Sequence, residues 1–274
     1  MYYLLTQEFK EQEKELVKII REAVVVDSIY LLGSTLNTRR TESIFMMDAP
    51  SCRYVGHYYL LILIDGSLIV NQVQDKIENT CRNFIPVTAI VLHKDQFKDW
   101  LSNGHYFASS ICHKAVMLYG EVLKVSTIAV EEVNKRFEKE RILVHYKGIN
   151  LVNEFLAGVE LYQVRKQNEL ATFMLHQATE NALQTMLKTI AGLYISTHNL
   201  DKLIRYCSMI SYTIPELLPR TNEKYQKIFS ILQEGYIESR YKENFSINAN
   251  ELLKLKEIVV NLQKLAASLI LQKS

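Results

Sequence analysis

The feature that most constrains the fold is a change of hydrophobic period near residue 125. Before it, three short apolar runs, at residues 28–32, 56–64 and 87–92, are rich in aromatic and β-branched residues and alternate with helical segments. After it, apolar residues recur only every three or four positions, as in helices. The sequence therefore predicts an α+β/α two-domain chain: a small mixed sheet with helices, followed by an all-helical up-and-down bundle.

We expect an α/β domain at residues 1–125, a connecting helix within residues 126–147 and the helical bundle at residues 148–274. A chain of 274 residues is long enough for two domains, and nine Gly and four Pro leave few helix breakers. The expected helices are residues 7–24, 68–84, 97–101, 105–118, 130–144, 150–166, 168–194, 200–210, 222–239 and 249–271. Asn199 or Thr197 is expected to cap the helix that begins at Leu200.

Composition narrows the class of protein. A net charge of +2 argues against a surface that coats nucleic acid, and the four cysteines form no Cys-x-x-Cys pair, which fits free thiols in a reducing compartment. The N-terminus is acidic and amphipathic, unlike a signal peptide, and the longest apolar run, residues 58–64, is far too short to span a bilayer. We therefore expect a soluble cytoplasmic protein that makes no membrane contact.

Gly33-Ser34 follows the first apolar run and is expected to form a turn whose backbone N–H groups and hydroxyl can bind a phosphate. Arg39 and Arg40 follow within reach of the same loop. A Gly-Ser pair after a strand, in the order helix, strand, Gly-Ser, strand, helix, strand, resembles the polymerase β-like nucleotidyltransferases. The resemblance implies that the pair binds a triphosphate.

The same resemblance implies a pair of acidic residues on the next strand that holds two divalent metal ions. That strand reads His57-Tyr58-Tyr59 where carboxylates are expected, and no Asp-x-Asp or Asp-x-Glu pair occurs in the region. Asp48 has Pro50 as its i+2 neighbour, and Asp65 stands alone at the end of the strand. We therefore expect no metal site and no cofactor; Mg²⁺ enters only if Asp48 and Asp65 converge as displaced ligands.

The helical half contains three motifs in order, and together they resemble the HEPN family. The matching residues are Ala171, Phe173, Gln177, Ala178 and Glu180, then Thr197, His198 and Leu200, then Arg240 and Tyr241. The resemblance covers residues 148–274 and implies a helical bundle that binds nucleotide or RNA and pairs as a homodimer. The candidate site residues are His176, Gln177, Glu180, His198, Arg240 and Tyr241.

HEPN proteins that cut RNA often carry an Arg followed by a His, with four to six residues between them. No Arg in this chain has a His at that spacing; Arg141 and His145 have three residues between them, and Arg165 and His176 have ten. Structural roles also compete with ligand binding: His176 as a core histidine, and His198 in a hydrogen-bond network at a helix start. The Arg240-Tyr241 pair can equally pin the last helix.

The leading hypothesis is a nucleotide- or RNA-binding protein with a degenerate transferase site and a HEPN bundle that lacks the ribonuclease motif. One alternative is an active nucleotidyltransferase, acting on a small molecule, a protein or an RNA end, which uses Asp48 and Asp65. The other is a purely structural interaction module. Whether the chain is an enzyme stays open between these hypotheses.

Overall fold

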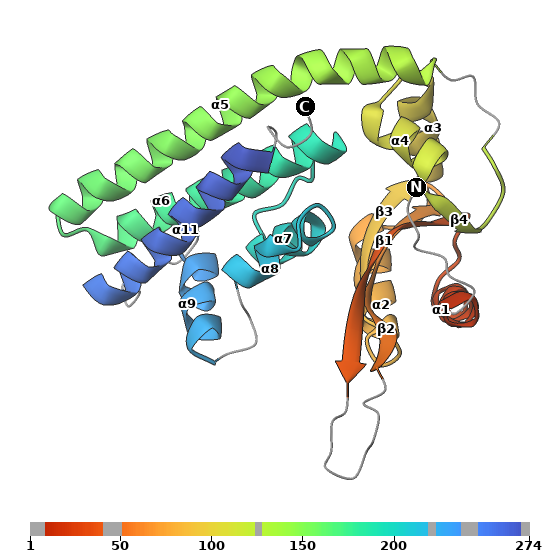
Figure 1. Ribbon diagram of the computed structural model, residues 1–274, viewed down its shortest axis with the longest axis horizontal. Coiled ribbons are helices and arrows are strands. Elements are labelled where there is room, and N and C mark those ends of the chain that lie inside the picture. Colours follow the sequence, from red (N-terminus) through yellow and green to blue (C-terminus); the bar gives the residue numbers. More distant parts are fainter. Residues whose placement is uncertain (1–8, 41–50, 124–127, 219–222, 237–245, 270–274) are drawn as a thin grey trace, which may run out of the picture. The chain divides into compact units, whose positions relative to one another are not determined.

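The computed structural model describes residues 9–40, 51–123, 128–218, 223–236 and 246–269 (Figure 1). The chain divides into two compact units, Met1–Val133 and Asn134–Ser274. Their boundary falls inside the segment for which the sequence predicts a connecting helix. No helix among the described residues is both long enough and apolar enough to cross a membrane.

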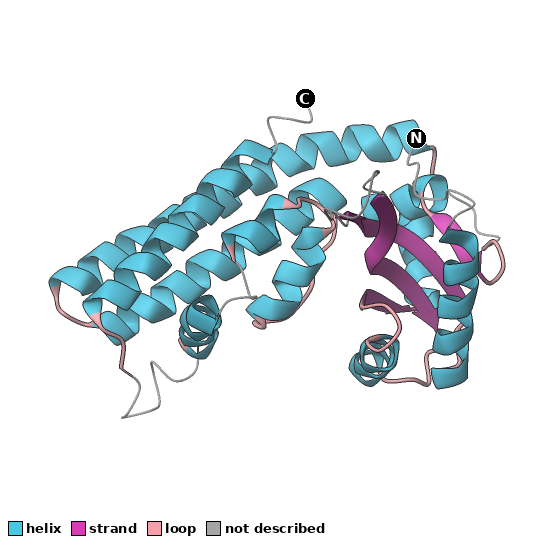
Figure 2. Ribbon diagram, turned by 60° about the horizontal axis from the view of Figure 1, so that its bottom comes forward, coloured by secondary structure: helices cyan, strands magenta, loops and turns pink. Residues whose placement is uncertain are grey.

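The first unit contains one small sheet and four helices among its described residues, before the long helix α5 begins. These elements are α1 (Lys10–Ala23), β1 (Ser28–Arg40), β2 (Ser51–Ile64), α2 (Val70–Cys81), β3 (Val87–His93), α3 (Lys94–Ser102), α4 (Tyr106–Lys114) and β4 (Val116–Tyr119). The strand order is β3-β2-β1-β4. β1 runs antiparallel to both β2 and β4, whereas β2 and β3 are parallel, so the sheet is mixed (Figure 2).

Helices pack on both faces of this sheet because side chains alternate between the faces along each strand. The core on one face joins α1 and α2 to the strands, and includes Leu16, Ile20, Leu60, Ile62, Ile64, Val73 and Ile77. On the other face, the ring of Tyr30 in β1 lies 6.2 Å from the ring of Phe97 in α3. This arrangement leaves β2 fully buried from Leu60 to Ile64.

Two predictions for this unit are wrong at the level of elements. The sequence predicts a turn at Gly33-Ser34, but β1 continues through both residues to Arg40, with Gly33 opposite Tyr59 and Ser34 opposite Tyr58. One extra residue between Leu31 and Gly33 makes a β-bulge, which keeps the pairing intact beyond it.

The helix predicted at residues 105–118 is also shorter than expected. α4 ends at Lys114 because Ala115 is extended, with φ −81° and ψ 147°. The following residues form β4, in which Met117 pairs with Tyr30 of β1. Local periodicity did not reveal β4, because pairing with β1 stabilises it.

The second unit is helical throughout its described residues. Its elements are α5 (Val130–Val164, whose first turn belongs to the first unit), α6 (Asn168–Met186), the π-helical turn η2 (Leu187–Ala191), α7 (Leu200–Ser208), α8 (Thr213–Leu217), α9 (Glu223–Glu234) and α11 (Ala249–Leu269). The predicted recurrence of apolar residues every three or four positions is confirmed in the last helix, where they form a buried seam of Leu252, Leu255, Val259, Leu262 and Ala266.

α5 is one continuous helix, where the sequence predicts two with a break near Gly148. It runs antiparallel to α6, because Gly148 lies against Thr185 whereas Gly158 lies against Met174. It also runs antiparallel to α11, as the hydrogen bonds from Gln263 to Asn153 and from Lys256 to Glu160 show. α6 and α11 are therefore parallel to each other, and α7–α9 lie between them in the chain (Figure 1).

Candidate functional site

The site begins at the end of α6, where the chain reverses direction. Gly192 has a left-handed conformation, with φ +67°, and its N–H donates to the carbonyl oxygen of Lys188 at 3.2 Å. The N–H of Leu193 donates to the carbonyl oxygen of Leu187, also at 3.2 Å. The bond from Gly192 to the carbonyl group four residues earlier is the αL capping motif, for which glycine is favoured because it has no Cβ. The segment that follows returns alongside α6.

A row of four polar side chains on α6 and η2 contacts this returning segment or α9. The row, here called the polar ladder, consists of His176, Glu180, Gln184 and Lys188. Residues four apart lie on the same side of a helix, so the ladder follows one side of α6. Gln184 donates from Nε2 to the carbonyl oxygen of Ile195 at 2.5 Å, and Lys188 places Nζ 4.3 Å from the centre of the Tyr194 ring.

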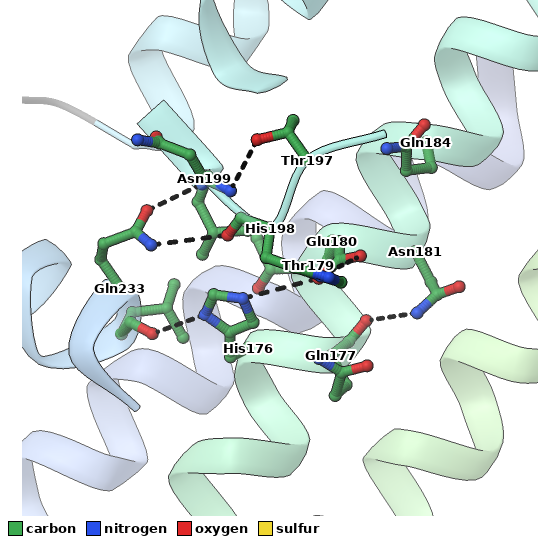
Figure 3. Close-up of polar contacts among 12 residues, drawn as sticks. His176, Gln177, Thr179, Glu180, Asn181, Gln184, Thr197, His198, Asn199 and Gln233 are labelled. Atoms are coloured by element: carbon green, nitrogen blue, oxygen red, sulfur yellow. Dashed lines mark hydrogen bonds and ion pairs between the residues drawn. The ribbon is translucent and has the colours of Figure 1, made fainter. Parts of the chain in front are cut away.

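Glu180 sits between two histidines of different exposure (Figure 3). The Nδ1 atom of His198 lies 3.0 and 3.1 Å from the two carboxylate oxygens, and 59% of its side chain is exposed. His176 is fully buried, and its Nε2 lies 3.6 Å from Oε2 of Glu180. That distance is within ion-pair range but too long for a hydrogen bond.

Burial raises the pKa of the Glu180 carboxyl group, but the nearby His176 and the hydrogen-bonded His198 outweigh this effect, so the pKa lies below its usual value. Glu180 is therefore ionised near neutral pH and orients the His198 ring by accepting its Nδ1–H. This leaves the Nε2 of His198 as the ring nitrogen available to a ligand.

The buried end of the cluster is fixed by α9. The Nδ1 of His176 lies 3.0 Å from the carbonyl oxygen of Leu232. A carbonyl oxygen only accepts hydrogen bonds, so Nδ1 carries the proton. The Nε2 atom of His176 then faces Glu180 and has no hydrogen-bond partner among the described residues.

Tyr236, just after α9, supplies an aromatic surface beneath both histidines. Its ring centre lies 4.5 Å from that of His198, and the two rings are stacked with an angle of 16° between them. It also lies 5.1 Å from the His176 ring and 6.4 Å from the Phe173 ring. Gly235 permits this approach, because a Cβ there would lie 2.8 Å from the Cγ2 atom of Thr172.

Side chains also bond to the backbone around His198 and hold this segment in place. Gln233 of α9 accepts the N–H of Leu200 at 2.7 Å and donates to the carbonyl oxygen of His198 at 3.5 Å (Figure 3). Asn199 caps α7 by accepting the N–H of Lys202 at 3.0 Å, which confirms the predicted capping role. The segment before α7 is thus fixed by side chains from α6, η2 and α9.

The residues described above lie within a segment that matches a known protein family. Residues 153–266 match the family model of the HEPN domain. This region is a HEPN domain. The match confirms the resemblance that the three sequence motifs indicate. It covers the last third of α5, the described parts of α6, η2, α7, α8 and α9, and most of α11. No curated protein shows significant similarity to the chain.

Within the HEPN domain, three of the six candidate site residues come together: His176, Glu180 and His198. Gln177 is half-buried beside them, and its Nε2 has no hydrogen-bond partner among the described residues. Arg240 and Tyr241 lie outside the described residues.

Sequence reasoning missed Gln184, Lys188, Gln233 and Tyr236. The four-residue spacing of the polar ladder was a usable signal, because polar residues repeated on one side of a largely apolar helix need partners. No comparable signal marked Gln233 or Tyr236, whose roles depend on α9 lying beside α6.

In the first unit, Gly33 and Ser34 lie inside β1, and Arg39 and Arg40 are the last two residues of the strand. The predicted phosphate-binding turn is therefore not formed, because these backbones belong to a strand paired with β2. The side chains of Arg39 and Arg40 lie outside the described part of the structure. A phosphate contact by these four residues stays a prediction that no longer rests on a turn.

Asp48 and Asp65 are the two carboxylates that an active nucleotidyltransferase would have to use, and the structure describes only one of them. Asp48 lies outside the described residues. Asp65 follows β2, and its Oδ1 accepts the N–H of Ser67 at 2.9 Å, a hydrogen bond that lowers the pKa of the carboxyl group. Across the described ranges, no three His, Cys, Asp or Glu side chains gather in a way that could hold a metal ion.

Proposed function

We propose that the HEPN domain binds a nucleotide or RNA through the exposed edge of His198. The observation that carries the proposal is the stacking of His198 on Tyr236, together with the contact by which Glu180 orients the His198 ring at its Nδ1 edge. A ring held in this way provides a surface on which a base can stack and a ring nitrogen that can form a hydrogen bond. Because the ring is already fixed, binding does not carry the entropy cost of ordering it.

The same contacts argue for binding in preference to RNA cleavage. The chain has no Arg–His pair at the expected spacing, and the second histidine of the cluster, His176, is fully buried and bonded to the backbone of Leu232. His198 offers a single group for proton transfer at a 2′-hydroxyl. Its contacts among the described residues are with Glu180, Gln233 and Tyr236, and none of these supplies a cation to stabilise charge at phosphorus.

For the first unit, we propose a nucleotidyltransferase-like fold without two-metal chemistry. The mixed four-stranded sheet with helices is consistent with that fold. His57 and Tyr59 occupy one face of β2 at positions where the transferase family carries acids, and the two rings lie 4.8 Å apart. Binding of nucleotides is therefore expected to be nearly indifferent to Mg²⁺.

The test is titration calorimetry of the full chain with AMP, GMP and UMP and with a short RNA, with and without Mg²⁺. His198→Ala should weaken binding by roughly 5- to 100-fold, the range expected for losing one stacked base. The control is His113→Ala, which removes an exposed histidine from the first unit. Equal affinity of the His198→Ala variant and the wild type would overturn the assignment of the site.

A second measurement addresses catalysis. Purified chain incubated with a mixed RNA pool should leave the RNA intact. Cleavage that disappears in the His198→Ala variant would instead show that a ribonuclease site is assembled in space, and the binding-only proposal would be wrong.

A further inference from the structure

A second exposed aromatic ring lies on the same returning segment as His198. Tyr194 is 60% exposed, and Lys188 holds its ammonium group 4.3 Å from the ring centre. A cation placed over a ring restrains that ring and also puts a positive charge beside it. Tyr194 therefore combines a stacking surface with a nearby group that can attract a phosphate.

The polar ladder sets the separation between the two exposed rings. Glu180 contacts His198, and Lys188 contacts Tyr194, eight residues further along α6 and η2. At a rise of ~1.5 Å per residue, the two anchors lie about 12 Å apart. Gln184, midway between them, bonds to the backbone of Ile195, so the segment is held at a third point as well.

The distance between the two rings indicates whether the ligand is a single nucleotide or a strand. Stacked bases along one strand are ~3.4 Å apart, so about 12 Å corresponds to three to four base steps, which is a stretch of about four to five nucleotides. One nucleotide cannot contact both rings at once. A flexible single strand can stack one base on each ring and let its backbone pass Lys188.

We infer that the HEPN domain binds single-stranded RNA along a strip from His198 to Tyr194, with a footprint of about four to five nucleotides. The inference rests on the proposed function, since His198 is one end of the strip, and it adds Tyr194 and Lys188 as the other end. Rings that stack on bases discriminate weakly between bases, so the strip favours single strands over duplexes more than it favours one sequence.

The experiment is a competition assay in which unlabelled uridine nucleotides one to six residues long displace a fluorescein-labelled eight-nucleotide RNA from the full chain. Wild-type affinity should rise at least tenfold between one and about five nucleotides and then level off. Tyr194→Ala should lose this gain while keeping its affinity for the single nucleotide. Tyr194→Phe, which retains the ring, should behave as the wild type.

The outcomes separate the inference from the proposed function. If Tyr194→Ala keeps the full gain with length, or if a duplex RNA of the same length competes equally, the strip is wrong while His198 binding stands. If a single nucleotide binds but length adds nothing, the inference fails in the same way. If neither single nucleotides nor oligonucleotides bind the wild type, the proposed function and the inference fail together.

Discussion

Glu13 shows how one residue can make stability depend on pH. It lies on the buried face of α1 with Leu16 and Ile20, and only 6% of it is exposed. Burial raises the pKa of its carboxyl group from 4.5 to about 7, which the charge of Lys10 offsets only in part. Its charge in turn adds to the effect of burial in raising the pKa of the Tyr58 phenol.

The sign of the pH effect follows from these pKa values. Below pH 4.5 the carboxyl group is protonated in the folded and the unfolded chain alike. Between pH 4.5 and about 7 the unfolded chain releases this proton while the folded chain keeps it, so the free energy of unfolding falls as pH rises. The loss is complete above about pH 7 and amounts to about 3 kcal/mol.

Glu13→Gln removes this ionisation and keeps the size of the side chain. We expect its guanidinium unfolding midpoint to lie close to that of the wild type at pH 5 and clearly above it at pH 8. Glu11→Gln, an exposed position on the same helix, should change neither midpoint appreciably. A wild-type pH dependence that persists in the Glu13→Gln variant would contradict the assignment.

At the scale of elements, two glycines of the continuous helix α5 face α6 in different ways. A Cβ on Gly148 would lie 2.1 Å from Oγ1 and 2.7 Å from Cγ2 of Thr185. Thr185 is buried, and its hydroxyl donates to the carbonyl oxygen of Asn181 at 2.7 Å, so it has little room to move. A Cβ on Gly158 would meet only the flexible side chain of Met174, at 3.3 Å.

Gly148→Ala should therefore lower the free energy of unfolding by ~1–3 kcal/mol through overpacking, although alanine is the better helix former. Gly158→Ala is the matched control and should be neutral or stabilising by up to ~1 kcal/mol. Urea denaturation measures both. Adding Thr185→Ala to Gly148→Ala should recover part of the loss, and similar effects of the two glycine substitutions would contradict the packing argument.

At the scale of the whole molecule, the expected homodimer stays a prediction. The resemblance to the HEPN family implies the pairing, and the apolar seam of α11 cannot provide the contact because the structure buries it within its own unit. Large apolar side chains are instead exposed within one turn of α5, at Ile142, Leu143 and Tyr146. Such clusters on a surface often mark contact sites between proteins.

We expect light scattering after size exclusion to give twice the 31.8 kDa mass of the chain. Combining Leu143→Lys with Tyr146→Lys should reduce the mass to that of the monomer, because two charges would be buried in the contact. Leu253→Lys, at an exposed apolar position of α11, should leave the dimer intact. A monomeric wild type would contradict the prediction.

The sequence by itself determined the helical second half and much of its site. Spacings of three and four residues indicate the seam of α11, and the local sequence indicates the cap at Asn199. The sequence motifs also include His176, Glu180 and His198, which lie together in the structure. These features are predictable because each depends on side chains close together in the chain, where the geometry of the helix is fixed.

Only the tertiary structure decided the features that depend on distant segments. β1 continues past Gly33 because β2 pairs with it, and Gly148 lies within α5 at a point where Thr185 of α6 fills the space that a side chain would take. Likewise, Tyr236 reaches His198 only because α9 packs beside α6. Contacts between residues so far apart in the chain leave no periodic signal in either partner, so packing alone brings these groups together.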